Sequence, residues 1–113
     1  MNREGTKALR QTGRNAATHA FLESLNGGPL TFGQLLAAQR EAEEASVSQF
    51  AAKLGVSRQH LHQLENGHKR VSPERAVRFA RLLGQSETFY LQLALQDLAN
   101  GSGISAHIEV RVA

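Results

Sequence analysis

Closely spaced helix start and stop signals restrict the fold of this 113-residue chain more than any other feature of its sequence. Ser and Thr accept the unpaired N–H groups at the start of a helix, and Gly takes the left-handed conformation that ends one. Between these signals the apolar residues recur at helical spacing. The expected starts are Thr31, Ser46, Ser57, Ser72 and Ser86, and the expected stops are Gly55, Gly67, Gly84 and the "NGSG" at 100–103. Five short helices with short connections predict an all-α bundle.

The N-terminal part of the chain is separate from this helical middle. The stretch "NAATHAFLESL" at 15–25 predicts a short amphipathic helix, and the "NGGPL" that follows it breaks the chain. We therefore expect three parts. They are an N-terminal extension at 1–28, a helical domain at 29–100 and a C-terminal segment at 101–113.

The C-terminal residues "SAHIEVRVA" alternate apolar and polar side chains with a period of two, which is typical of a β-strand. Ile108, Val110 and Val112 would share one face of that strand. The helical part of the chain offers no second strand, and an unpaired strand edge tends to aggregate. We therefore expect pairing with the same strand of a second copy across a twofold axis, which gives a homodimer. The alternative is a disordered tail.

Composition and charge narrow the class of protein. There is no Cys, so neither disulfides nor thiolate metal sites are available. The chain lacks both an apolar run of the roughly 18 residues that span a membrane and a secretory signal, so we expect a cytoplasmic protein. Residues 53–81 carry seven Lys and Arg against two Glu, a balance of +5, whereas residues 30–52 carry one Arg against three Glu. This basic centre points to a polyanionic partner, the alternative being a solvated charged face.

The stretch "GVSRQHLHQLENGHKR" at 55–70 has few apolar residues for a helical segment. Two short helices joined by a turn with Gly55 and Val56 describe a helix-turn-helix, whose second helix enters the major groove of DNA. Leu61 and Leu64 would hold that helix to the bundle. Its outer side would present Arg58, Gln59, His62 and Gln63. Arg matches guanine and Gln matches adenine through two hydrogen bonds, so this mixture can read bases where uniform charge would only hold phosphates.

Residues 32–83 resemble the Cro/lambda-repressor family of helix-turn-helix regulators, also called the Xre type. The family pattern "LAxxLGVSxxxLxxxExG" reads "FAAKLGVSRQHLHQLENG" here, with Phe50 in place of the first Leu. The resemblance implies a lambda-repressor-like five-helix bundle. It also implies that Arg40 pairs with Glu65 and so pins the recognition helix to the bundle, the alternative being that both side chains point into water.

Position by position, the resemblance assigns base reading to Arg58, Gln59 and Gln63, with His62 as a weaker candidate. It assigns phosphate contacts to the helix cap and to the loop after the recognition helix, at Ser57, Asn66, His68, Lys69 and Arg70. One position departs from the pattern. Relatives carry Gln directly after the cap of the first motif helix, where it touches the DNA backbone, and this chain has Val47. Ser46 or Ser48 would have to supply that contact.

Metal binding and catalysis find no support in the sequence. His60 and His62 lie about 200° apart around a helix axis, so they cannot bind one metal ion together. We expect no metal and no cofactor. Ser57 is already assigned as a cap, and neither an orienting acid nor an oxyanion donor accompanies it, so we expect no enzyme. His62 is left as a neutral hydrogen-bonding contact or as a solvated residue.

Residues 70–98 resemble, more loosely, the continuation seen in small single-domain regulators, including antitoxins of the HigA type. The first hypothesis is a dimeric repressor that binds double-stranded DNA at a palindromic operator, associates with the nucleoid and has no membrane partner. The alternative is an antitoxin whose main partner is a toxin protein. The N-terminal segment to Leu25 and the acidic "EAEEA" at 41–45 would then bind the toxin. A third hypothesis, motivated by Val47, is a helix-turn-helix that only bridges other proteins.

Overall fold

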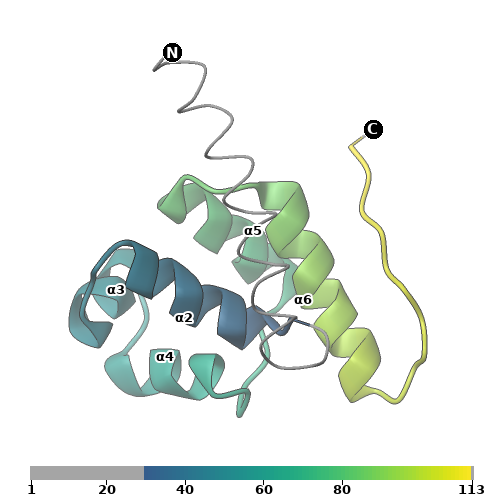
Figure 1. Cartoon of the computed structure of the whole chain (residues 1–113), viewed down its shortest axis with the longest axis horizontal. Coiled ribbons are helices and arrows are strands. Elements are labelled where there is room, and N and C mark those ends of the chain that lie inside the picture. Colours follow the sequence, from purple (N-terminus) through teal and green to yellow (C-terminus); the bar gives the residue numbers. More distant parts are fainter. Residues whose placement is uncertain (1–29, 113) are drawn as a thin grey trace, which may run out of the picture. The chain divides into compact units, whose positions relative to one another are not determined.

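Five α-helices and no β-strand make up residues 30–112, the part of the chain that the computed structural model describes. The helices are α2 (Phe32–Ala42), α3 (Val47–Leu54), α4 (Arg58–Glu65), α5 (Pro73–Leu83) and α6 (Glu87–Gly101) (Figure 1). The expected all-α helix-turn-helix bundle is confirmed. The N-terminal extension at 1–28, with its helix at 15–25, lies outside the described residues. No helix of the described part is long and apolar enough to cross a membrane.

Local sequence signals account for where each helix begins. All five expected Ser and Thr caps accept a hydrogen bond from the backbone N–H three residues ahead. The side-chain oxygens of Gln34 and Gln49 in turn accept the backbone N–H groups of Thr31 and Ser46, which completes two capping boxes. Gly55, in the left-handed conformation with a φ of 74°, ends α3 and turns the chain toward α4. These signals keep α3 and α4 short.

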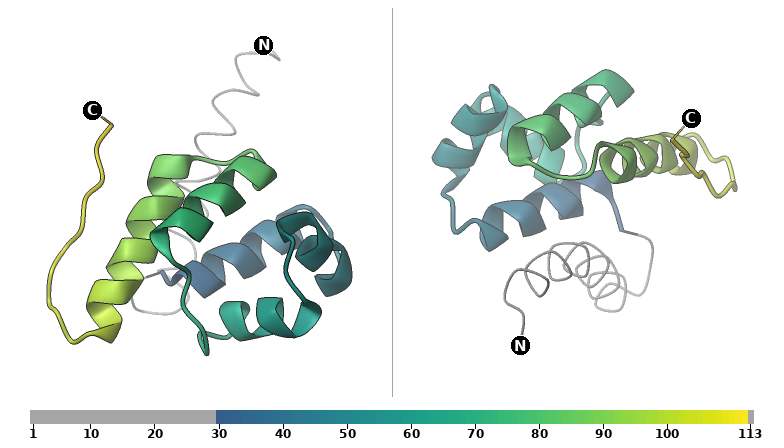
Figure 2. Two further views of the ribbon diagram at one scale, coloured as in Figure 1. Left: turned by 180° about the vertical axis from the view of Figure 1, so that it is seen from behind. Right: turned by 90° about the horizontal axis from the view of Figure 1, so that it is seen from above.

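Apolar side chains from all five helices form the core. The fully buried ones include Leu36, Phe50, Leu61 and Phe79, one each from α2 to α5. From α6, Tyr90 packs edge-on against Phe32 of α2, with the ring centroids 5.6 Å apart. α5 lies along α6, and α2 packs on α4 (Figure 2). Since burial of one such side chain contributes about 1.5–3 kcal/mol, this packing fixes the position of α4.

The C-terminal segment at 104–112 is extended chain beside α6, and the expected β-strand is not formed (Figure 1). Gln96 donates to the carbonyl oxygen of Ala106 at 2.7 Å and accepts from the N–H of Ile108 at 2.8 Å. Gln92 accepts from the N–H of Val110 at 3.0 Å. Side-chain amides of one helix, and not a neighbouring strand, bind these backbone groups, so the segment lacks the ladder that defines a strand. Pairing across a dimer stays a prediction.

Candidate nucleic-acid interface

α3, the turn at 55–57 and α4 form a helix-turn-helix (Figure 1). The N–H of Val56 donates to the carbonyl oxygen of Ala51 at 3.0 Å and closes the turn, while the Val56 side chain is half-buried. Leu61 and Leu64 are buried and hold α4 against the bundle. Because α4 is anchored along one side, its opposite side can meet a ligand.

The outer side of α4 carries the four side chains expected to read bases. At about 100° of rotation per residue they cluster on the side of the helix opposite Leu61 and Leu64. Arg58, Gln59 and His62 are exposed, and Gln63 is half-buried. Among the described residues the side chains of Arg58, Gln59 and Gln63 have no hydrogen-bond partner. Their donors and acceptors are therefore available together in one patch.

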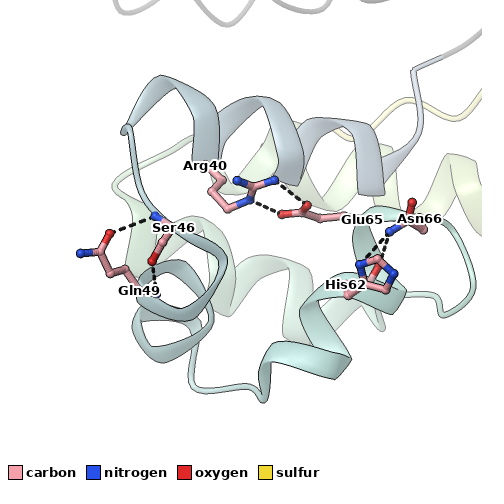
Figure 3. A network of polar contacts seen from close by, with 6 residues as sticks. All are labelled: Arg40, Ser46, Gln49, His62, Glu65 and Asn66. Atoms are coloured by element: carbon pink, nitrogen blue, oxygen red, sulfur yellow. Dashed lines mark hydrogen bonds and ion pairs between the residues drawn. The ribbon is translucent and has the colours of Figure 1, made fainter.

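His62 is oriented as a hydrogen-bond donor by Asn66 (Figure 3). Asn66 Nδ2 donates to the carbonyl oxygen of His62 at 2.8 Å and lies 3.3 Å from His62 Nδ1. Because an amide nitrogen only donates, Nδ1 is the acceptor and the neutral ring carries its proton on Nε2. This Nε2–H can donate to a base edge or to a phosphate oxygen.

An ion pair between α2 and α4 fixes the C-terminal end of α4 (Figure 3). Arg40 Nε and Nη2 lie 2.9 and 3.0 Å from the two carboxylate oxygens of Glu65. The Arg40 side chain is 20% exposed and the Glu65 side chain 10%. The hydrogen bond to Glu65 raises the pKa of Arg40 above its ordinary value, against the effect of burial. The structure thus brings together the two residues that the resemblance paired.

The residues expected to contact phosphates lie at the starts of α3 and α4 and in the loop after α4. All seven are exposed, namely Ser46, Ser48, Ser57, Asn66, His68, Lys69 and Arg70. Ser46 and Ser57 use their hydroxyl oxygens as helix caps, so each hydroxyl hydrogen is left to donate elsewhere. Val47, between two of these serines, is half-buried and has no side-chain donor.

Arg70 differs from the rest of that set because its guanidinium is bound to α6. Nη1 donates to the carbonyl oxygen of Asp97 at 2.7 Å. The Asp97 carboxylate in turn accepts the N–H of Phe32 at 2.9 Å. Burial raises the pKa of Asp97, while the bond from Phe32 and the charge of Arg70 oppose the rise. Sequence reasoning missed Asp97 because its partners are 27 and 65 residues away, beyond any local pattern.

A second contact that sequence reasoning missed joins α4 to α5. His60 Nε2 lies 3.4 Å from Arg75 Nη1, and both residues are half-buried. Burial, and then the charges of Arg75 and Lys69, lower the pKa of His60 below its ordinary value of 6.5. The neutral ring is therefore favoured, and His60 connects α4 to α5 through this single side-chain contact. Residues 30–112 contain no group of three or more His, Cys, Asp or Glu placed to hold a metal ion.

A short helix buried on its inner side, preceded by a tight turn and carrying hydrogen-bonding groups outside, defines the helix-turn-helix class of DNA-binding domains. A family model described as a helix-turn-helix domain matches residues 31–88, slightly more than half of the chain. The chain belongs to this family and carries a DNA-binding domain of the kind found in transcription regulators. Neither a search of curated proteins nor a search of solved structures finds a match.

Proposed function

We propose that the protein is a transcriptional repressor of the Cro/lambda-repressor (Xre) type, acting as a homodimer on a palindromic operator. The observation that carries this proposal is the outer side of α4. Arg58, Gln59 and His62 are exposed there, on a helix whose other side is buried. Such a repressor would act in the cytoplasm, on the nucleoid, and would block a promoter by occupying it.

Each base-reading residue is assigned by the groups that it presents. Arg58, at the leading end of α4, would donate two hydrogen bonds to a guanine, and Gln59 would pair with an adenine. His62 would donate from Nε2 to an acceptor on a base edge, and Gln63 would read a neighbouring base. Each well-formed two-bond contact discriminates against the wrong base by about 1–3 kcal/mol.

Contacts to the DNA backbone would flank α4 and set its orientation in the groove. The proposed set is Ser46, Ser48, Ser57, Asn66, His68 and Lys69. Val47 has no donor, so Ser46 or Ser48 would supply the contact at the start of α3. Each phosphate that a cation neutralises steepens the fall of log affinity with log salt by about 0.9.

A homodimer would place its two α4 helices in successive major grooves, about 34 Å apart. We place the dimer contact at the C-terminal segment, where Ile108, Val110 and Val112 alternate with polar residues. In support, the N–H groups of His107 and Glu109 have no hydrogen-bond partner among the described residues. One edge of the extended chain is therefore open to pairing.

Selection from a randomised duplex library, followed by sequencing of the bound DNA, tests the proposal. The wild type should enrich a palindrome. Gln59→Ala should lose preference at one base pair of each half-site, while the control Lys69→Ala should weaken binding to all sequences alike. Failure of the wild type to enrich any sequence would contradict the proposal, and an unchanged preference in Gln59→Ala would refute the assignment of α4.

The second candidate function is an antitoxin of the HigA type, which neutralises a toxin protein and represses its own operon. It is favoured by the acidic stretch at the end of α2 and directly after it. Glu41 and Glu44 are exposed there and opposite in charge to the region from α4 to α5. A basic toxin surface would bind there. Co-purification with the product of a neighbouring gene, lost in Glu41→Lys/Glu44→Lys, would support this function. If the protein is recovered without that gene product, the antitoxin function is contradicted and the repressor function remains.

A further inference from the structure

We infer that Arg70 is a positioning residue and does not itself contact a phosphate. Its guanidinium is bound at a site on α6, called the seat below, and in this way it holds the loop at 66–71 in place for DNA binding. The inference rests on the proposed function, because the loop acts on DNA only if His68 and Lys69 meet the backbone. It replaces the role that the family resemblance gives to Arg70.

The seat of Arg70 is formed by Asp97 and Gly101 near the end of α6. Nη1 donates to the carbonyl oxygen of Asp97 at 2.7 Å, a short distance of the kind found when the donor is charged. The guanidinium also occupies the space in which a Cβ atom of residue 101 would stand, and glycine leaves that space open. The C-terminal end of a helix carries partial negative charge, which suits a cation. Both contacts commit the guanidinium to α6.

The loop is held on both sides of Lys69, whose side chain is exposed and forms no hydrogen bond with α6. On one side the N–H groups of His68 and Lys69 donate to the carbonyl oxygen of Gln63, at 2.9 and 3.3 Å, and fold the loop back on α4. On the other side Arg70 reaches α6, and the adjacent Val71 is buried. The exposed side chain of Lys69 therefore extends from backbone that is fixed before any DNA binds.

Asp97 extends the same connection to α2. Its carboxylate accepts the N–H of Phe32 and satisfies one of the donors that the start of a helix leaves unpaired. α2 is joined to α4 by Arg40 and Glu65. The recognition helix, its loop, α6 and α2 are thus connected in a ring. Displacing Arg70 opens this ring at the loop and removes no DNA contact.

This arrangement separates the effect of Arg70 from that of a phosphate contact. A loop that is ordered in advance loses less conformational entropy on binding, so Arg70→Ala should weaken DNA affinity about tenfold. Its salt dependence should be unchanged, because the number of neutralised phosphates is the same. Lys69→Ala, by contrast, should lower the slope of log affinity against log salt by about 0.9.

Gly101→Ala tests the seat while leaving Arg70 in the chain. Ala ordinarily stabilises a helix relative to Gly, so without a seat this variant should bind DNA as the wild type does. With the seat, the new Cβ displaces the guanidinium. Gly101→Ala should then weaken binding as much as Arg70→Ala does, again with an unchanged salt slope. The double variant should be no weaker than either single variant.

The experiment measures operator affinity of the full chain over a series of salt concentrations for the wild type, Arg70→Ala, Gly101→Ala and Lys69→Ala. Amide hydrogen exchange of residues 66–70 is measured in parallel without DNA. A flatter salt slope in Arg70→Ala, or wild-type binding by Gly101→Ala, overturns the inference. If the wild type binds no DNA, the proposed function fails. Faster exchange in Arg70→Ala and Gly101→Ala then still supports the seat, and unchanged exchange overturns it.

Discussion

Arg40→Met should destabilise the domain by about 3 kcal/mol, because it leaves the Glu65 carboxylate charged, mostly buried and unpaired. Two hydrogen bonds between charged groups are lost, and bonds of this kind contribute about 1.5–3 kcal/mol each. The two side chains are 20% and 10% exposed, so water reaches the remaining charge in part. The expected loss therefore lies at the lower end of the range for a broken buried pair, about 3–5 kcal/mol. A domain of this size is stable by only about 4–12 kcal/mol.

Urea unfolding followed by circular dichroism measures this loss, as a midpoint shift of about 2 M for a slope near 1.5 kcal/mol/M. Glu65→Met should lose a similar amount, and the double variant should recover most of it, since no charge then remains buried. The exposed pair of Arg81 and Glu87 supplies the control, and Arg81→Ala should cost less than about 1 kcal/mol. A loss in Arg40→Met no larger than the control would refute the reasoning, as would a double variant as unstable as the two losses added.

Three further perturbations test other parts of the structure. Tyr90→Phe should keep or raise the free energy of unfolding, by up to about 1–2 kcal/mol, because the buried Tyr90 hydroxyl has no hydrogen-bond partner among the described residues. Thermal or urea unfolding measures this change, and a clear loss of stability would reveal a buried water bound to the hydroxyl. Because the pKa of His60 is lowered in the folded state, the stability that His60 contributes above about pH 6.5 is lost as the pH falls below that value. His60→Gln should remove this part of the pH dependence of stability, measured by urea unfolding at several pH values. His107→Gln, at an exposed position, is the control. Deleting residues 107–113 should convert the proposed dimer to a monomer, and an unchanged dimer in sedimentation would refute pairing through that segment.

The helices could be predicted from the sequence because their boundaries are set by neighbouring residues. Ser46 and Gln49, three positions apart, complete a capping box with each other, and Gly55 needs only its own backbone conformation to end α3. The outer side of α4 is equally local. Once Leu61 and Leu64 face inward, helical geometry alone places the base-reading candidates on the other side.

Contacts between distant parts of the chain could not be predicted in this way. The pairing of Arg40 with Glu65 was expected from the family resemblance, and the spacing of the two residues carries no such signal. Arg70, next to Lys69 in a basic stretch, has the same sequence character as a phosphate contact. Its direction is decided by Asp97, on a helix that the local pattern cannot position.

The contacts of the C-terminal segment also could not be predicted from the local sequence pattern. Its alternating pattern predicts a β-strand, and the structure has extended chain without a strand, because a pattern cannot tell which groups will bind the backbone of that chain. A neighbouring strand and a row of side-chain amides both suit the N–H groups of Ile108 and Val110. The structure uses the amides of Gln92 and Gln96.

Gln92 and Gln96 fit the extended chain because the rise of one helical turn is close to the rise of two extended residues. Four residues of a helix advance about 6.0 Å, and two residues of a strand advance about 6.6 Å. Amides one helical turn apart can therefore hold every second N–H of an extended segment whatever side chains it bears. The docking of the segment on α6, as distinct from the proposed dimer contact, should therefore tolerate substitutions at 108 and 110, with proline as the exception because it lacks the N–H. A single residue inserted between 103 and 106 would present the opposite set of backbone groups to α6 and turn every side chain of the segment to its other face.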